Sequence, residues 1–166
     1  MPKQKRRIMD QKKKPSVFDV AAYILEKQPK KRSITAWKLQ KLVYYCQAWG
    51  LVWDESPLFN EKIFAWANGP VVEELYQLYK GLFQIEKSQK GSSENLSEAQ
   101  KDTVNHVLSA YGDKTAQWLS DLTHTEYPWI EAREGMEIGE RGENEIKLST
   151  MYEYYSSIDS CHKITS

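Results

Sequence analysis

The sharpest polar cluster in the chain is the segment Thr123-His124-Thr125-Glu126-Tyr127-Pro128-Trp129. A histidine this close to a glutamate could form a general acid–base pair. The spacing does not require that pairing. The sequence also places neither a second histidine nor a nucleophile at the spacing of a known catalytic motif. The alternative is structural: Thr123 and His124 bond to backbone at helix ends, and Trp129 packs beneath them. We favour the structural interpretation, so the sequence predicts no catalytic residues and no enzyme.

Motifs for metals, nucleotides and other cofactors are also missing. Possible metal ligands are Cys46, His106, His124 and the pair Cys161-His162, but no C-x-x-C or H-E-x-x-H spacing is present. There is no G-x-G-x-x-G, no P-loop and no G-x-S-x-G. The Asn68-Gly69-Pro70 segment is interpreted as a structural turn in which Gly69 adopts positive φ. The sequence therefore predicts neither a metal nor a cofactor.

Aromatic residues, which are common at binding surfaces, are abundant in the chain, with 6 Trp, 10 Tyr and 4 Phe. Adjacent residues on a helix point in different directions, so Tyr44 and Tyr45 are not expected to share one core. Tyrosine and tryptophan at surfaces are enriched in protein–protein hot spots, although tyrosine rings also border cores with their hydroxyls in water. The candidate partner-binding residues are Tyr44, Tyr45, Trp66, Tyr76, Tyr79, His124 and Trp129.

Charge is distributed unevenly, although the formal net charge is zero. Residues 1–14 carry a net charge of +6, which leaves −6 for the rest of the chain. This arm could contact nucleic acid, or it could be a solvated tail that keeps the protein in solution. The solvated tail is the favoured interpretation, because a basic tail without a folded element that contacts the bases has little sequence specificity for nucleic acid. The candidate nucleic-acid contacts are Lys5, Arg6, Arg7, Lys12, Lys13 and Lys14.

Length and hydropathy favour one soluble domain of the cytoplasm. A chain of 166 residues is most simply one domain. No apolar run approaches the ~20 residues that span a bilayer, and no apolar segment follows the basic N-terminus as in a secretory signal. The expected organisation is a flexible basic arm over 1–14, a folded domain over 15–160 and a tail over 161–166, with no membrane partner.

Helical periodicity dominates the pattern along the domain. Ser16, Thr35, Ser97 and Asp113 are predicted helix caps, and Gly50 is expected to end the helix that begins after Thr35. Residues 51–53 and 62–67 are expected to be extended, and a further helix is expected to begin at Pro70. Residues 87–95 read as a linker and 135–145 as a mobile loop, and Ser149 is expected to open a last helix. The predicted fold is mainly α: a compact single domain of about six helices with a minor β-hairpin.

Several of these segments together resemble a known family. They are Leu39-Gln40-Lys41-Leu42-Val43-Tyr44-Tyr45-Cys46-Gln47, Pro57-Leu58-Phe59, Ala65-Trp66-Ala67-Asn68-Gly69-Pro70-Val71-Val72, and the later Thr123-His124 with Pro128-Trp129. This pattern resembles the Panacea domain, also described as SocA-like or GepA-like, which is found in phage-associated proteins and antitoxins. The resemblance extends from about residue 16 to residue 158.

The resemblance implies a binding role. Members of the family are similar to neutralising components of toxin–antitoxin pairs that bind a cognate toxin directly, and one SocA-like member resembles an adaptor that delivers a toxin to a protease. The first hypothesis is therefore an antitoxin that acts by protein–protein contact. The alternatives are a DNA-binding autoregulator that uses the basic arm, and a proteolytic adaptor of phage origin with a protease as partner.

Overall fold

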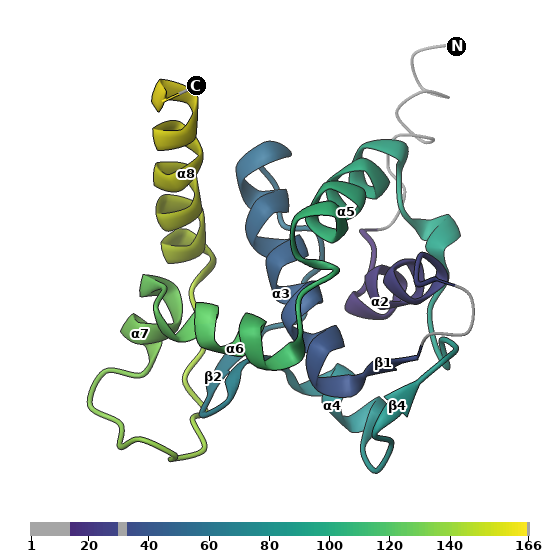
Figure 1. Cartoon of the computed structure of the whole chain (residues 1–166), viewed down its shortest axis with the longest axis horizontal. Coiled ribbons are helices and arrows are strands. Elements are labelled where there is room, and N and C mark those ends of the chain that lie inside the picture. Colours follow the sequence, from purple (N-terminus) through teal and green to yellow (C-terminus); the bar gives the residue numbers. More distant parts are fainter. Residues whose placement is uncertain (1–13, 30–32, 166) are drawn as a thin grey trace.

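Helix α3 (Ala36–Trp53) forms the centre of the molecule, as the computed structural model in Figure 1 shows. The structure describes residues 14–29 and 33–165, with side chains described up to residue 159. The predicted nucleic-acid contacts Lys5, Arg6, Arg7, Lys12 and Lys13 lie outside the described residues, and Lys14 is exposed. Seven α-helices and two small antiparallel sheets make up the described part, which confirms the mainly α fold.

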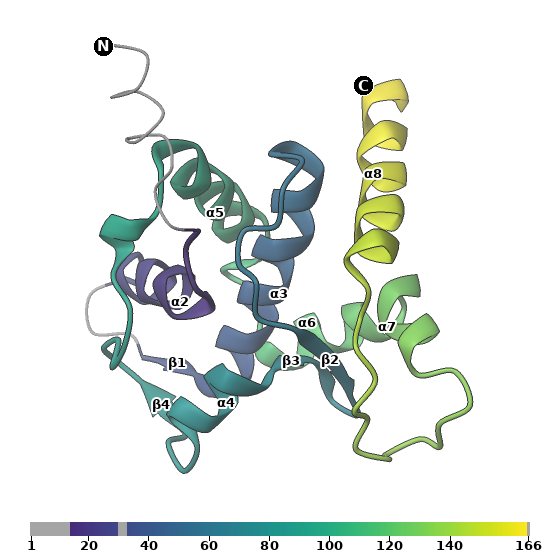
Figure 2. The ribbon, with the colours of Figure 1, turned by 180° about the vertical axis from the view of Figure 1, so that it is seen from behind.

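The central helix is buried on all sides from Leu39 to Leu51, as expected for a helix enclosed by the rest of a domain. Thr35 caps it, as predicted, by accepting a hydrogen bond from the Lys38 backbone N–H at 3.0 Å. Helices α5 (Glu98–Tyr111) and α8 (Leu148–Thr165) pack against it, and both views place α3 between them. Figure 2 shows the same arrangement from behind.

Two prominent polar side chains on α3 hold other segments by their backbones. The Gln40 amide donates to the Val72 carbonyl at 3.0 Å and accepts from the Val72 N–H at 2.9 Å. About two helical turns further along α3, the Gln47 side chain accepts a hydrogen bond from the Leu58 N–H at 2.6 Å and donates one to the Phe59 carbonyl at 2.8 Å. A buried amide that satisfies two backbone groups at once replaces the pairing those groups would have with water. These glutamines therefore fix a strand and a loop to the central helix.

The prediction that Gly50 ends this helix is wrong. The helix continues through residues 51–53 and is capped by Asp54, whose backbone N–H donates to the Gly50 carbonyl at 2.9 Å. A Cβ at Gly50 would lie 3.6 Å from the Leu58 Cβ and 3.9 Å from the Thr103 Cγ2. The glycine therefore lies where two neighbouring segments approach the helix closely, and it is not a helix stop.

The β-hairpin is present, but its second strand is not the predicted one. Strand β2 (Ile63–Trp66) pairs antiparallel with β3 (Gly69–Val72), and residues 51–53 take no part. Pro70 therefore lies within a strand, and the following helix, α4 (Glu73–Tyr79), begins three residues later than predicted. Residues 144–146 add a third extended segment, since the Ile146 N–H donates to the Ile63 carbonyl at 2.8 Å.

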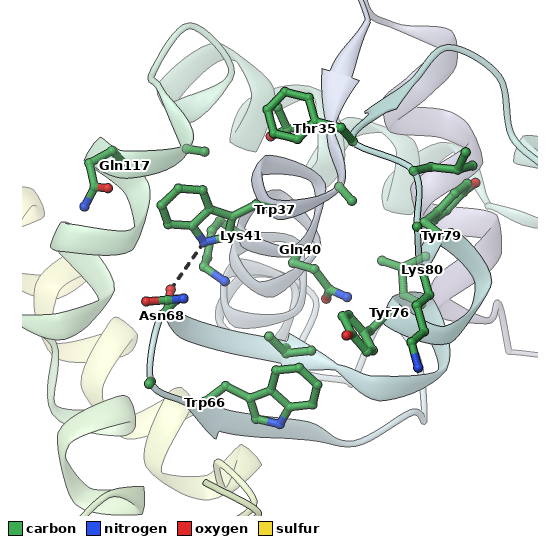
Figure 3. A pocket seen from close by; sticks show the side chains of 18 of the residues that line it. Thr35, Trp37, Gln40, Lys41, Trp66, Asn68, Tyr76, Tyr79, Lys80 and Gln117 are labelled. Carbon is green, nitrogen blue, oxygen red and sulfur yellow. Dashed lines mark hydrogen bonds between the residues drawn. The ribbon is translucent and has the colours of Figure 1, made fainter. Parts of the chain in front are cut away.

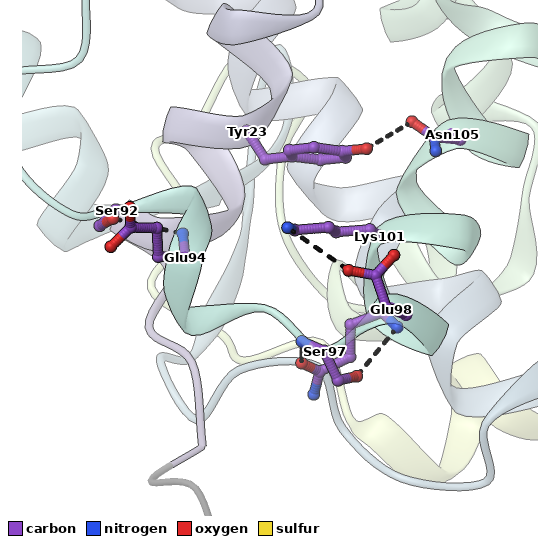
Figure 4. A network of polar contacts seen from close by, with 8 residues as sticks. Tyr23, Ser92, Glu94, Ser97, Glu98, Lys101 and Asn105 are labelled. Atoms are coloured by element: carbon purple, nitrogen blue, oxygen red, sulfur yellow. Dashed lines mark hydrogen bonds and ion pairs between the residues drawn. The ribbon is translucent and has the colours of Figure 1, made fainter.

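The first helix and α5 meet through a polar contact that Figure 4 shows. Helix α2 (Val17–Glu26) has the predicted Ser16 capping box, and α5 has the predicted Ser97 capping box. The Tyr23 hydroxyl donates to Asn105 Oδ1 at 2.9 Å, and Lys101 lies over the Tyr23 ring while pairing with Glu98.

The segment 87–95 is more ordered than a linker. It contains a short 3₁₀-helix, η1 (Ser93–Asn95), and the Asp19 carboxylate accepts hydrogen bonds from the Ser92 N–H at 2.8 Å and from the Asn95 amide at 3.0 Å. Burial acts to raise the pKa of Asp19, but the hydrogen bonds from Ser16, Ser92 and Asn95 together lower it below its ordinary value. The segment is therefore held against the start of α2.

The remaining elements frame the hairpin. Strands β1 (Ile34–Thr35) and β4 (Gln84–Ile85) form a second small sheet. Helix α6 (Ala116–His124) is capped by Thr115, so the predicted cap at Asp113 is wrong by two residues. Helix α7 (Tyr127–Ala132) follows, and α8 begins at Leu148 and continues to Thr165, into the segment expected to be a tail. Within the described residues, no helix combines the length and apolarity needed to cross a membrane.

Candidate functional site

A wide apolar groove lies where the start of α3, the β-hairpin, α4 and the start of α6 meet (Figure 3). Its volume is about 800 Å³, within the range of sites that enclose a ligand or a few side chains. We refer to it below as the groove. The residues that line it are Thr35, Ala36, Trp37, Gln40, Lys41, Trp66, Ala67, Asn68, Val71, Leu75, Tyr76, Tyr79, Lys80, Gly81, Leu82, Phe83, Thr115, Ala116, Gln117, Gly139 and Arg141.

Three of the predicted partner-binding residues come together in this groove. Trp66 and Tyr76 meet edge to face with ring centroids 5.0 Å apart, and Figure 3 shows both rings beside the opening. Tyr79 is buried and forms part of the wall. Two further aromatic residues, Trp37 and Phe83, complete the lining and were not among the predicted residues. Phe83 is the most exposed of them, at 78%.

The Asn68-Gly69-Pro70 turn supports one side of the groove. The Asn68 carbonyl accepts a hydrogen bond from the Ser120 hydroxyl at 2.6 Å and lies 3.4 Å from the Trp37 indole nitrogen, which donates to it. Gly69 has a φ of +117°, as the sequence predicted for this turn. The turn thus joins the hairpin to both α3 and α6, which fixes the width of the groove on that side.

Lys41 is buried beside this turn, with no exposed surface. Its ammonium nitrogen Nζ donates to the Pro70 carbonyl at 2.9 Å. Burial disfavours the charged form and lowers the pKa of Lys41 to about 7. The sequence does carry a signal for the burial of Lys41, because this lysine lies inside a run of apolar helix residues.

Burial of Lys41 should make stability depend on pH. The unfolded chain keeps the lysine proton up to an ordinary pKa of 10.5, whereas the folded chain loses it near 7, so stability rises with pH between these values. We expect the free energy of unfolding to increase by up to roughly 1.4 kcal/mol per pH unit from pH 7 to 9, and Lys41→Met to abolish most of that slope. Urea unfolding at several pH values measures it, with the exposed Lys147→Met as the control.

Tyr44 and Tyr45 are not surface residues, and the expectation that they cannot share one core is wrong. Both are buried, with ring centroids 5.3 Å apart. The Tyr45 hydroxyl donates to the Glu126 carboxylate at 2.7 Å, and the Tyr155 hydroxyl bonds the same oxygen at 2.9 Å and Tyr44 at 3.0 Å. Because α3 is enclosed on all sides, neighbouring residues can point in different directions and still contact the core, so adjacency on this helix does not force either ring to the surface.

His124 and Glu126 lie in different surroundings. The Glu126 carboxylate is buried among tyrosine hydroxyls, while the His124 ring stacks on Trp129 at 4.1 Å. Burial lowers the pKa of His124, which favours a neutral ring at pH 7. Trp129 in turn donates from its indole nitrogen to the Trp66 carbonyl at 2.9 Å. These residues therefore brace the outer side of the hairpin, in keeping with the structural interpretation.

Arg133 organises the segment that was expected to be a mobile loop. Its guanidinium donates to the Ala65 carbonyl at 2.8 Å and to the Glu137 and Glu140 carbonyls at 3.0 and 2.7 Å. The loop brings Arg141 over the Trp66 ring, with the guanidinium carbon 4.1 Å from the ring centroid. Nothing in the local sequence pattern predicts this contact, because it depends on a loop that packs against a distant hairpin.

Metal ligands do not gather anywhere in the described part of the chain, where no group of three or more His, Cys, Asp or Glu side chains could hold an ion. Cys46 is buried in the core, as predicted, and burial raises the pKa of its thiol. Cys161 and His162 lie among the residues whose side chains are not described.

Comparison with known proteins agrees with the pattern in the sequence. The family model described as "Antitoxin SocA-like, Panacea domain" matches residues 39–130, which is more than half of the chain. The match runs from α3 to α7 and includes the hairpin, and it is narrower than the extent of 16–158 that the sequence suggested. Searches of curated proteins and of solved structures found no match. The chain belongs to the family of antitoxin SocA-like, Panacea domain proteins.

Proposed function

We propose that this protein is an antitoxin that neutralises a cognate protein toxin by direct binding, and that the groove is the surface that contacts the toxin. Family membership supports the antitoxin role. We propose a binding protein of the cytoplasm rather than an enzyme. The Glu126 carboxylate, which could have served as a general base, is hydrogen-bonded to tyrosine hydroxyls in the core.

The exposed apolar lining of the groove is the observation that carries the choice of surface. Trp37, Leu82 and Phe83 expose 37%, 43% and 78% of their surfaces around one depression. Large apolar side chains that gather at one concave site cost free energy in water, and such patches mark interaction surfaces. Buried aromatic anchors also provide most of the affinity at protein interfaces.

The first experiment is co-expression with the open reading frame next to the gene. An antitoxin rescues growth from a toxic neighbour and co-purifies with it as a stoichiometric complex. If the neighbouring frame is not toxic, or if a toxic neighbour is neither rescued nor bound, the antitoxin proposal fails.

A matched pair of exposed aromatic residues tests the surface. Phe83 lies in the groove, whereas Tyr152, exposed by 43%, lies on α8 away from it. We expect Phe83→Ala to weaken toxin binding about tenfold or more and Tyr152→Ala to leave it unchanged, as measured by calorimetry. Both variants should keep the melting temperature of the parent, because both side chains are exposed. Equal affinities for the two variants would place the toxin on another surface.

A further inference from the structure

The groove combines apolar walls with a positive charge that is not neutralised locally. Lys80 and Arg141 line it, and no Asp or Glu is found among the described residues that do so. No carboxylate of the described residues forms an ion pair with Lys80 or Arg141. The groove is therefore electropositive, although the folded part of the chain carries more acidic than basic residues.

Arg141 is held in position to meet a partner. Its guanidinium carbon lies 4.1 Å from the Trp66 ring centroid and 5.9 Å from that of Tyr76, so both rings contact it. A guanidinium that stacks on aromatic rings keeps its N–H groups, which lie in its plane, available to a carboxylate in a bidentate geometry. Arg141 lies outside residues 39–130, the part of the chain that the family model matches.

We infer that the groove binds an acidic, apolar segment of the toxin, in which an aromatic or aliphatic side chain packs between Trp37, Trp66 and Phe83 while a neighbouring Asp or Glu pairs with Arg141 and Lys80. This inference rests on the proposed function and names the chemistry of the bound segment. Charge complementarity of this kind fixes specificity and register, while the apolar contact supplies most of the affinity. The basic segment 1–14 of this chain has the wrong charge to occupy the groove itself.

Two short synthetic peptides with blocked ends provide the test. Both carry the same Phe and Leu residues, and one has Glu where the other has the uncharged Gln. Titration into the ¹⁵N-labelled protein is followed through the indole N–H signals of Trp37 and Trp66. We expect the Glu peptide to shift these signals and to bind about fivefold more tightly than the Gln peptide, with a difference that shrinks at high salt.

Charge variants link the preference to the named residues. Arg141→Gln combined with Lys80→Gln should remove the difference between the peptides, and Lys147→Gln, a change in an exposed lysine outside the groove, should preserve it. Equal binding of the two peptides, or no binding of either, would overturn the inference. A protein dimer that Phe83→Glu dissociates would also overturn it, because a second copy would then fill the groove.

The outcomes separate this inference from the proposed function. Growth rescue by a chain that binds neither peptide refutes the chemistry of the groove and leaves the antitoxin role standing. Binding of the Glu peptide without any toxic neighbour supports the chemistry of the groove and counts against the antitoxin role.

Discussion

Gly69→Val is expected to destabilise the protein by about 4 kcal/mol. Two effects add at this position. Gly69 has a φ of +117°, which side chains with a Cβ rarely adopt, and a Cβ placed there would lie 2.6 Å from the Lys41 Cε and 3.2 Å from the Thr123 hydroxyl. Relief would require movement of the turn or of a fully buried lysine. Urea unfolding followed by tryptophan fluorescence measures the loss.

Gly135→Val separates the two effects. Gly135 has a φ of +80°, but a Cβ there would meet no atom within 4 Å. This control therefore reports backbone strain alone, and we expect it to cost about 2 kcal/mol. If both valine variants lose the same stability, the close approach of Lys41 to the turn contributes nothing to the cost of Gly69→Val.

Glu126→Ala is expected to cost about 3–4 kcal/mol. The Glu126 carboxylate accepts the hydroxyl protons of Tyr45 and Tyr155 at 2.7 and 2.9 Å inside the core. Removal of the acceptor leaves two buried hydroxyls without that partner and opens a cavity beside the ring of Tyr45. Thermal unfolding should show a large decrease in melting temperature, with the helical signal of the folded state retained at low temperature.

Glu126→Gln is the matched control for this prediction. Its side-chain carbonyl keeps an acceptor for the tyrosine hydroxyls, so a loss of only about 1 kcal/mol is expected near pH 5. A loss as large as that of the alanine variant would show that the negative charge, and not the acceptor, stabilises the core.

The same pair of proteins has a pH signature. Burial raises the folded-state pKa of Glu126 above its ordinary value of 4.5, and the two tyrosine bonds oppose this only in part. The group thus favours the folded state most below pH 4.5, and that contribution is lost as pH rises through the raised pKa. The Gln variant lacks this loss, so its stability relative to the parent should improve with rising pH.

Local rules were sufficient for the elements that depend on neighbouring residues. Ser16 and Ser97 form the predicted capping boxes, because a cap and the first turn lie within four residues of each other. Gly69 has the predicted positive φ. The mainly α fold also followed from helical periodicity, and the family from several short segments whose order along the chain is distinctive.

The sequence did not show which aromatic rings reach the surface. Tyr44, Tyr45, Trp66, Tyr76 and Tyr79 were indistinguishable as candidates, yet the first two lie in the core, Trp66 and Tyr76 line the groove, and Tyr79 is a buried residue at its wall. Burial depends on what packs against each face of α3, and α8 joins that packing from more than a hundred residues away along the chain.

The sequence alone determined the mainly α fold, the caps at Ser16, Thr35 and Ser97, the glycine turn and the family, because each depends on local geometry or on short motifs. Only the tertiary structure decided that Lys41 is buried beside the turn, that Glu126 belongs to the core, and that Arg141 covers Trp66. Those three placements depend on contacts between segments far apart in the chain, and residue type and spacing carry no record of such contacts.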